Sequence, residues 1–170
     1  DYKNRIRNIK EFNLNQKNNN LPFRKGIALM PAKFGISFNK PSLNQGGALV
    51  HVYSDGSIRL NHGGTEMGQG LFIKVAQVVA ECFKVSVDQI HITSTNTAEV
   101  PNTSATAASS GSDLNGMAAW NASTVIKNRM VDHAAKLFKK NKKDIILNDG
   151  RVVCGNKSLS FSELAFSCWE

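Results

Sequence analysis

Two loops rich in small residues are the segments of this chain whose composition could do chemistry. The first, residues 62–70, reads His-Gly-Gly-Thr-Glu-Met-Gly-Gln-Gly, and the second, residues 103–112, consists mainly of Thr, Ala and Ser. Each loop leads into a segment with helical periodicity, so each should end at a helix N-terminus. The first turn of a helix leaves backbone N–H groups without partners, and the helix dipole adds partial positive charge there. The two loops therefore predict a site for phosphate or another anionic group.

The residue types limit what these loops can bind. Neither loop has the glycine spacing of a dinucleotide-binding fingerprint, and the chain has no Gly-Lys-Ser/Thr of a P-loop. The cysteines, Cys82, Cys154 and Cys168, form no C-x-x-C pair, so we expect buried, reduced thiols and no zinc or iron–sulfur site. The four histidines form no metal set, and His51 and His62 are expected to pack within a hairpin. Loops of this composition also connect elements without binding a ligand, and that alternative stays open at this point.

The first half of the chain predicts a helix, several short strands and a second helix. Apolar residues recur at helical spacing within residues 1–18, at Tyr2, Ile6, Ile9 and Phe12. Short apolar runs at residues 26–30 and 34–38 predict strands. Alternating residues on both sides of Ser54-Asp55-Gly56-Ser57 predict a β-hairpin within residues 47–62. Apolar residues at i, i+4, i+7, i+8 and i+11 from Leu71 predict a helix over about residues 71–84.

The second half predicts a strand at residues 90–95 and then a long polar loop, which is uncommon without a function. A long helix should follow from Ser112 or Asp113, both good N-caps, to about Phe138. A second hairpin is expected at residues 145–153, and a last helix should begin at Ser160 or Ser162. The predicted fold class is α+β: a mixed or antiparallel sheet with the helices packed on one face, as in a two-layer sandwich.

The composition is that of a globular protein, with 41% hydrophobic and 20% charged residues among 170. No run approaches the roughly 18 apolar residues that a membrane helix needs, and we do not expect the polar first ten residues to act as a secretory signal. We therefore expect a cytoplasmic protein without a membrane partner. The net charge is +8, but residues 41–126 carry more acidic than basic side chains. The basic cluster at residues 139–143 is expected to be the solvated end of a helix, so nucleic acid is not an expected partner.

A series of short motifs runs in order and without large gaps from about Gly26 to Asn121. They are FGISF at 34–38, LNQGGAL at 43–49, HVY at 51–53, DGS at 55–57, HGGTEMGQG at 62–70, STNT at 94–97, VPNTS at 100–104, TAAS at 106–109 and DLNG at 113–116. Together they resemble the molybdopterin-binding region of the xanthine dehydrogenase family. Residues 1–25, which precede this match, are predicted to be an N-terminal helix and linker. The resemblance implies that residues 26–170 belong to a molybdenum cofactor-binding domain, which we expect to be truncated at its C-terminus.

The resemblance also implies which residues hold the cofactor. The Met-Gly-Gln stretch would contact the pterin, and the second loop would wrap the cofactor near its metal and its phosphate. The cofactor-binding residues so implied are Met67, Gly68, Gln69, Thr106, Ala107, Ala108, Ser109, Ser110, Gly111 and Ser112. Ser110 and Gly111 stand where many members have other small residues, so backbone contacts are expected there. Gln69 has a second interpretation, as a structural amide that only satisfies loop backbone.

A substrate-binding segment is implied just after residues 34–38, where this chain has Asn39, Lys40 and Leu43. Asn39 and Lys40 differ from the threonine and the apolar residue of animal members. Lys40 would meet an anionic purine or a carboxylated azaheterocycle, or it would point to solvent. Glu66 is not expected to be the catalytic base, because the family's glutamate lies in a Gly-Glu segment that this sequence lacks. We expect Glu66 to hydrogen-bond its own loop, and we assign no catalytic or metal-ligating residue.

The implied activity is oxidative hydroxylation of purines such as hypoxanthine and xanthine to urate, or of aldehydes, at a molybdenum–molybdopterin cofactor. FAD and 2Fe-2S clusters would lie on other domains or subunits. Those parts and the remaining molybdopterin-binding region would be the partners of this chain, and the isolated chain is expected to be inactive. One alternative is a free-standing anion- or nucleotide-binding module without redox activity. The other is a purely structural fragment.

Overall fold

The computed structural model describes residues 1–100 and 103–169, and it divides into two compact units, residues 1–35 and 36–170. Unit 1 contains the predicted first helix, α1 (Tyr2–Asn18), which buries none of its residues. The side chain of Asn13 bonds both backbone groups of Lys25, at 2.8 Å each. The Lys25 ammonium lies 4.0 Å from the centre of the Phe12 ring. These contacts fold the segment after α1 back onto the helix.

The strands predicted at residues 26–30 and 34–38 do not form, and both predictions were wrong. Both segments are irregular and mostly exposed, and the side chains of Met30 and Phe34 are 86% and 75% exposed. A short apolar run forms a strand when a neighbouring strand satisfies its backbone, and neither segment has such a neighbour. The boundary between the units lies after the domain boundary predicted at residues 25/26, and that division stays a prediction.

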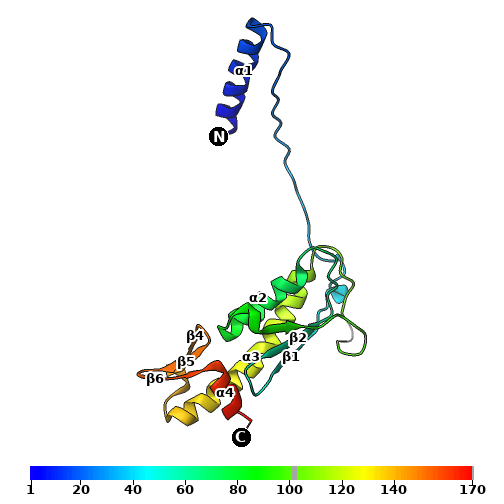
Figure 1. The fold of residues 1–170 in the computed structure, drawn as a ribbon. Coiled ribbons are helices and arrows are strands. Elements are labelled where there is room, and N and C mark those ends of the chain that lie inside the picture. The colour runs from blue at the N-terminus through cyan, green and yellow to red at the C-terminus, as the bar shows by residue number, and fades with distance from the viewer. Residues whose placement is uncertain (101–102, 170) are drawn as a thin grey trace. The chain divides into compact units, whose positions relative to one another are not determined.

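Unit 2 begins with a mixed sheet covered on one face by helices (Figure 1). The strands β1 (Ala48–Val52), β2 (Ile58–His62) and β3 (Ile90–Ile92) lie in that order, with β1 antiparallel and β3 parallel to β2. The predicted hairpin is confirmed, and Asp55 stabilises its turn by accepting from the N–H and hydroxyl of Ser57. The helices α2 (Leu71–Phe83) and α3 (Gly111–Phe138) pack against each other and against the sheet.

A second, separate sheet follows α3. The strands β4 (Ile146–Asn148), β5 (Arg151–Cys154) and β6 (Lys157–Ser160) form an antiparallel meander. The predicted hairpin corresponds to β4 and β5, whereas β6 was missed because Lys-Ser-Leu-Ser shows no clear apolar alternation. The helix α4 (Phe161–Ser167) begins with a capping box between Ser160 and Glu163. Single helical turns, η1 (Pro41–Leu43), η2 (Val87–Gln89) and η3 (Lys142–Asp144), link the larger elements. The predicted α+β class is confirmed, with two small sheets where one was expected.

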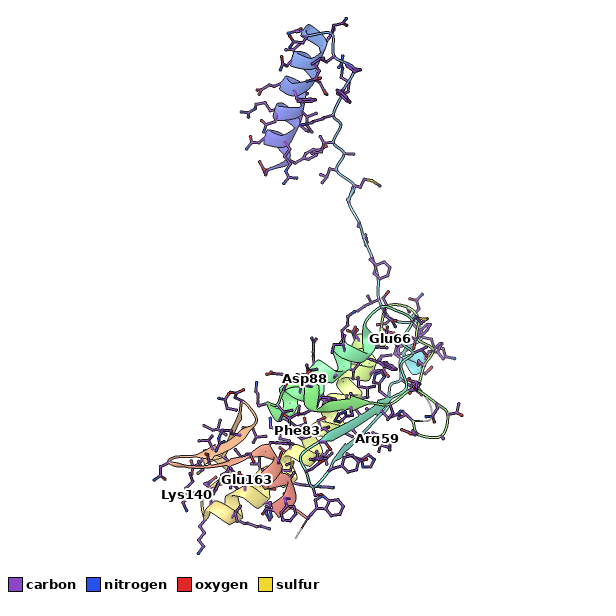
Figure 2. All side chains as sticks on the ribbon, viewed as in Figure 1. Arg59, Glu66, Phe83, Asp88, Lys140 and Glu163 are labelled. Atoms are coloured by element: carbon purple, nitrogen blue, oxygen red, sulfur yellow. The ribbon has the colours of Figure 1, made fainter. Side chains whose placement is uncertain are left out.

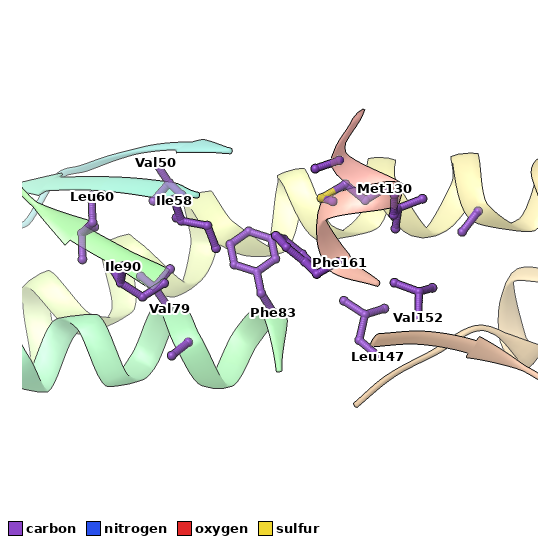
Figure 3. Packing of buried hydrophobic residues seen from close by; sticks show 14 of the residues in the cluster. Val50, Ile58, Leu60, Val79, Phe83, Ile90, Met130, Leu147, Val152 and Phe161 are labelled. Atoms are coloured by element: carbon purple, nitrogen blue, oxygen red, sulfur yellow. The ribbon is translucent and has the colours of Figure 1, made fainter. Parts of the chain in front are cut away.

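One hydrophobic core joins both sheets (Figure 3). Ile58 and Leu60 of β2 and Val79 of α2 are completely buried. The rings of Phe83, at the end of α2, and Phe161, at the start of α4, meet edge to face with centres 5.6 Å apart. This aromatic pair therefore connects the half of unit 2 that carries the two loops to the half that carries the second sheet.

Cys82 and Cys154 are buried as predicted, whereas Cys168 is exposed, because it follows the short α4 at the edge of the core. Within residues 1–100 and 103–169, no group of His, Cys, Asp and Glu side chains could hold a metal ion. None of the described helices combines the length and the apolar character needed to cross a bilayer.

Candidate functional site

The two loops meet at the starts of α2 and α3. The N–H of Thr65 in the first loop donates to the hydroxyl of Thr106 in the second, at 2.8 Å. Beside this bridge lies a cavity of about 440 Å³, which is within the range of small-molecule sites. It is lined by Met67, Gln69, Leu71, Lys74, Thr106, Ala107, Ala108, Ser109, Gly111 and Ser112.

Eight of the ten residues expected to bind the cofactor line this cavity, and two do not. Gly68 donates its N–H to Glu66 instead, at 2.8 Å. Ser110 is buried, and its hydroxyl donates to the carbonyl of Ala107 at 3.1 Å. The structure thus brings the two predicted segments together at one site, while cofactor contact by each residue stays a prediction.

Glycine allows the first loop to pass directly against the second. A Cβ on Gly63 would lie 1.9 Å from the hydroxyl oxygen of Thr103. A Cβ on Gly64 would lie 2.6 Å from a methyl of Leu71 and 2.7 Å from the amide nitrogen of Asn115. No side chain fits at either position without displacing its neighbours, so these glycines set the spacing of the cavity walls.

Glu66 caps the start of α2 with its own carboxylate. It accepts from the N–H groups of Gly68 at 2.8 Å, Gly70 at 3.0 Å and Phe72 at 2.9 Å. The bond from Phe72, followed by those from Gly70 and Gly68, lowers the pKa of Glu66 below its ordinary value. The expectation that Glu66 bonds its own loop is confirmed. One N–H of the first turn of α2, that of Phe72, and the two N–H groups of Gly68 and Gly70 before it are therefore taken by the chain itself, which differs from the simple picture of two open helix starts.

Gln69 is held by the loop and also faces the cavity. The side-chain carbonyl of Gln69 accepts from the backbone N–H of Met67 at 2.6 Å, and its side-chain NH2 donates to the backbone carbonyl of Thr65 at 2.8 Å. These bonds agree with its interpretation as a structural amide. Because Gln69 and the 67% exposed Met67 also line the cavity, the same bonds fix the Gln69 side chain and the Met67 backbone at a surface that a ligand would touch.

The second loop, unlike the first, places residues other than glycine in the left-handed backbone region. Ala108 and Ser109 adopt left-handed φ values of 53° and 52°, a conformation that costs about 1–2 kcal/mol for each residue other than glycine. The next residue, Ser110, returns to the right-handed region, and such a reversal turns successive N–H groups toward one concave side. Strain of this kind persists where surrounding contacts enforce it, often at binding sites.

Among the described residues, no side chain accepts from the first N–H groups of α3 as Glu66 does at α2, and the acidic Asp113 of its first turn makes no such bond. The helix begins at Gly111 with Ser110 as N-cap, so the predicted caps, Ser112 and Asp113, were wrong by one turn or less. Ser110 makes no capping bond, because its hydroxyl is engaged with Ala107. Within the described part of the chain, the N–H groups of residues 111–113 find no acceptor. They remain available to an anion.

Sequence reasoning missed Lys74, which lines the cavity one turn into α2. A cation near a helix N-terminus opposes the helix dipole, and that unfavourable placement was the signal that could have identified it. No carboxylate of the described residues lies within ion-pairing distance of Lys74. Because the lining contains a cation, hydroxyls and open N–H groups and no acidic side chain, its donor set fits a phosphate-bearing ligand.

The three residues expected to bind substrate do not line this cavity. Asn39, Lys40 and Leu43 are exposed, and Lys40 is the N-cap of η1. The side-chain amide of Asn44 bonds both the N–H and the carbonyl of Phe38 at 2.9 Å, which closes the segment into a turn. The role of these three side chains stays a prediction.

This turn is tied to the second loop by backbone hydrogen bonds. The N–H of Ser37 donates to the carbonyl of Ala108 at 2.9 Å, and the N–H of Ser104 donates to the carbonyl of Gln45 at 3.0 Å. The hydroxyl of Ser104 also bonds the Leu43 carbonyl. The expected substrate segment and the second loop therefore form one connected structure.

His62 supports the first loop from behind. Its side chain is 1% exposed, Nδ1 accepts from the N–H of Gly64 at 3.1 Å, and the ring contacts Phe72 edge to face. Burial lowers the pKa of His62, and the negative charge of Glu66 partly opposes that effect. The predicted packing role of His62 is confirmed.

Comparison with known proteins connects this geometry to a family. The whole chain, residues 1–170, matches the family described as the molybdopterin cofactor-binding domain. It is 51% identical over 126 residues to xanthine dehydrogenase/oxidase of Rattus norvegicus, which covers 74% of the chain and 9% of that protein. It is 51% identical over 131 residues to xanthine dehydrogenase of Blastobotrys adeninivorans, covering 77% of the chain and 9% of that protein. The chain therefore spans less than a tenth of the length of these relatives.

A solved structure shows the same fold. The chain matches reconstituted CO dehydrogenase from Oligotropha carboxidovorans with a TM-score of 0.66 and 25% identity, over 72% of this chain and 16% of that one. The resemblance to xanthine dehydrogenases predicted from the motifs is confirmed by the identities above. The protein belongs to the molybdopterin cofactor-binding domain family.

Proposed function

We propose that this chain forms part of the molybdenum-cofactor cradle of a xanthine dehydrogenase-type hydroxylase. The observation that carries the proposal is the single cavity at which both predicted loops meet. When bound, the cofactor supplies the redox chemistry that the side chains of this chain lack. Under this proposal the parent enzyme hydroxylates purines such as hypoxanthine and xanthine, and this chain alone is inactive.

The two walls of the cavity take different ends of the cofactor in this proposal. Met67 and Gln69 face the pterin, because their loop is already satisfied internally. The phosphate lies against Lys74 and the open N–H groups at the start of α3, where positive charge and free donors coincide. Thr106 and Ser109 add hydroxyl donors on the same side.

The remaining parts of the enzyme follow from the same proposal. Asn39, Lys40 and Leu43 contribute to the substrate pocket, and their turn reaches it through its bonds to the second loop. The rest of the molybdopterin-binding region completes the cradle, and FAD and 2Fe-2S centres on other domains or subunits accept the electrons. The location proposed for this enzyme is the cytoplasm.

Lys74→Met in the full-length parent enzyme tests the cradle. We expect the purified variant to retain about tenfold less molybdenum and pterin than the wild type, because one charge-assisted phosphate bond is lost. Lys74→Arg should retain most of the cofactor. Lys136→Met, an exposed substitution in the last turn of α3, is the matched control and should equal the wild type. Wild-type enzyme without molybdenum and pterin would contradict the proposal.

A free-standing anion- or nucleotide-binding module is the second candidate, and the open N–H groups of α3 favour it equally. Thermal unfolding with inorganic phosphate distinguishes the two. A phosphate-dependent rise in the unfolding temperature, in a wild-type protein that carries no molybdenum or pterin, would favour the module over the cradle.

A further inference from the structure

The carboxylate of Glu66 does at the start of α2 what a bound anion would otherwise do. It accepts from three N–H groups, those of Gly68, Gly70 and Phe72, within the loop and the first turn of the helix. Figure 2 labels Glu66 at this helix start. Because the carboxylate is covalently part of the loop, these donors are satisfied before any ligand enters.

The loop that Glu66 holds is intrinsically difficult to order. Gly68 and Gly70 have φ values of 97° and 74°, in the left-handed region that glycine adopts readily. Glycine loses more conformational freedom on ordering than any other residue, so a wall built from it favours disorder unless something fixes it. Glu66 bonds the N–H of both glycines and thereby fixes both.

The order at the glycines extends to the Gln69 side chain between them and to the Met67 backbone beside them. Met67 and Gln69 are joined by a hydrogen bond, and Gln69 is bonded to the Thr65 carbonyl. Thr65 is bonded in turn to Thr106 of the opposite wall. The order imposed by Glu66 is therefore transmitted through Met67, Gln69 and Thr65 to the surface that lines the cavity.

We propose that Glu66 is a positioning residue that presets the Met67–Gln69 wall and directs the anionic end of the cofactor toward α3. This inference rests on the proposed function, namely that the cavity takes the cofactor. The carboxylate accepts from the N–H of Phe72 in the first turn of α2 and from those of Gly68 and Gly70 just before it, whereas the N–H groups of residues 111–113 at the start of α3 have no acceptor within the described residues. The anionic end of the cofactor therefore meets Lys74 and the open N–H groups of α3 and not the donors that Glu66 already occupies.

A matched pair of variants in the full-length enzyme tests this inference. Glu163 also bonds a helix start, at α4, where it accepts from the N–H and hydroxyl of Ser160. Figure 2 shows Glu163 far along unit 2 from Glu66. Glu66→Gln and Glu163→Gln make the same chemical change, so both should lower the unfolding temperature. Glu66→Gln alone should weaken cofactor retention, by about tenfold, as supporting partners of a bound group typically do.

Chemical rescue adds a readout that general destabilisation would not move. In Glu66→Ala, acetate can enter the place of the lost carboxylate and accept from the same N–H groups. Acetate should then restore molybdenum and pterin retention toward the wild-type level, whereas chloride at equal ionic strength should not. If Glu66→Gln does not fold, Glu66→Asp, which keeps the charge on a shorter arm, should show intermediate retention.

The outcomes separate this inference from the proposed function. Equal cofactor retention by the wild type, Glu66→Gln and Glu163→Gln would overturn the positioning role alone. Equal losses in the two glutamine variants would also overturn it, since the effect would then be one of overall stability. A wild-type enzyme without molybdenum and pterin would overturn the proposed function and this inference together.

Discussion

At the start of α2, His62 and Glu66 lie close in the sequence, and their pKa values fall for different reasons. Hydrogen bonds from Phe72, Gly70 and Gly68 stabilise the carboxylate of Glu66 and lower its pKa. Burial disfavours the charged imidazole of His62 and lowers its pKa as well. The folded protein therefore favours a charged Glu66 carboxylate and a neutral His62 imidazole. Protonation in acid disfavours the folded state at both residues.

The free energy of unfolding of unit 2 should therefore fall as the pH is lowered. In the variant His62→Gln this fall should be smaller. Between the lowered pKa of folded His62 and about 6.5, the unfolded chain binds more protons than the folded one. The free energy of unfolding should decrease as the pH drops below about 6.5. Urea unfolding from pH 7 to pH 5 measures this slope. An identical slope in the wild type and His62→Gln would contradict the prediction.

The sequence could identify the types of residue at the cavity but not their hydrogen-bond partners. Met67, Gln69 and the second loop were found because their motifs are contiguous. Lys74 was missed because its role depends on the cavity that it lines, and that cavity exists only where the two loops meet. The sequence likewise could not show that Ser110 leaves the first N–H groups of α3 without an acceptor among the described residues, because this depends on the bond from the Ser110 hydroxyl to Ala107.

At the scale of elements, strong local signals predicted the structure well. The hairpin of β1 and β2 and the helix α2 followed from alternation and helical spacing. The failures came where long-range partners decide the outcome. Residues 26–30 are apolar without a neighbouring strand, whereas β6 is polar and becomes a strand because β5 pairs with it. Pairing of this kind has no local signature.

The aromatic contact between α2 and α4 gives a prediction at this scale. Phe161→Ala should lower the free energy of unfolding by about 3–5 kcal/mol, because it removes a buried ring and leaves a cavity against Phe83. Chemical denaturation of the isolated chain measures the change. Phe166→Ala is the control, since that ring is 57% exposed and should change stability little. Equal losses in the two variants would contradict this account of the core.

For the whole molecule, the buried core lies entirely within unit 2, between residues 50 and 165. Unit 1 buries none of its helix and contributes no residue to that core. The folding of unit 2 should accordingly not depend on residues 1–35.

Limited proteolysis checks this independence. Trypsin should cut first after Arg24, Lys25 or Lys33, which lie in the exposed irregular stretch, and should leave a resistant fragment containing unit 2. The fragment should unfold within about 2 °C of the intact chain, because residues 1–35 contribute no residue to the buried core. Early cleavage inside α2 or α3, or a much lower unfolding temperature of the fragment, would contradict it.

The backbone bonds from Ser37 to Ala108 and from Ser104 to Gln45 have a thermodynamic consequence under the proposed function. They join the segment that would recognise the heterocycle to the strained loop that would grip the phosphate. A displacement of the substrate segment would then displace the second loop, and the reverse. Thermodynamic linkage makes this coupling reciprocal. If bound cofactor changes the affinity for substrate by some factor, bound substrate changes the affinity for the cofactor by the same factor.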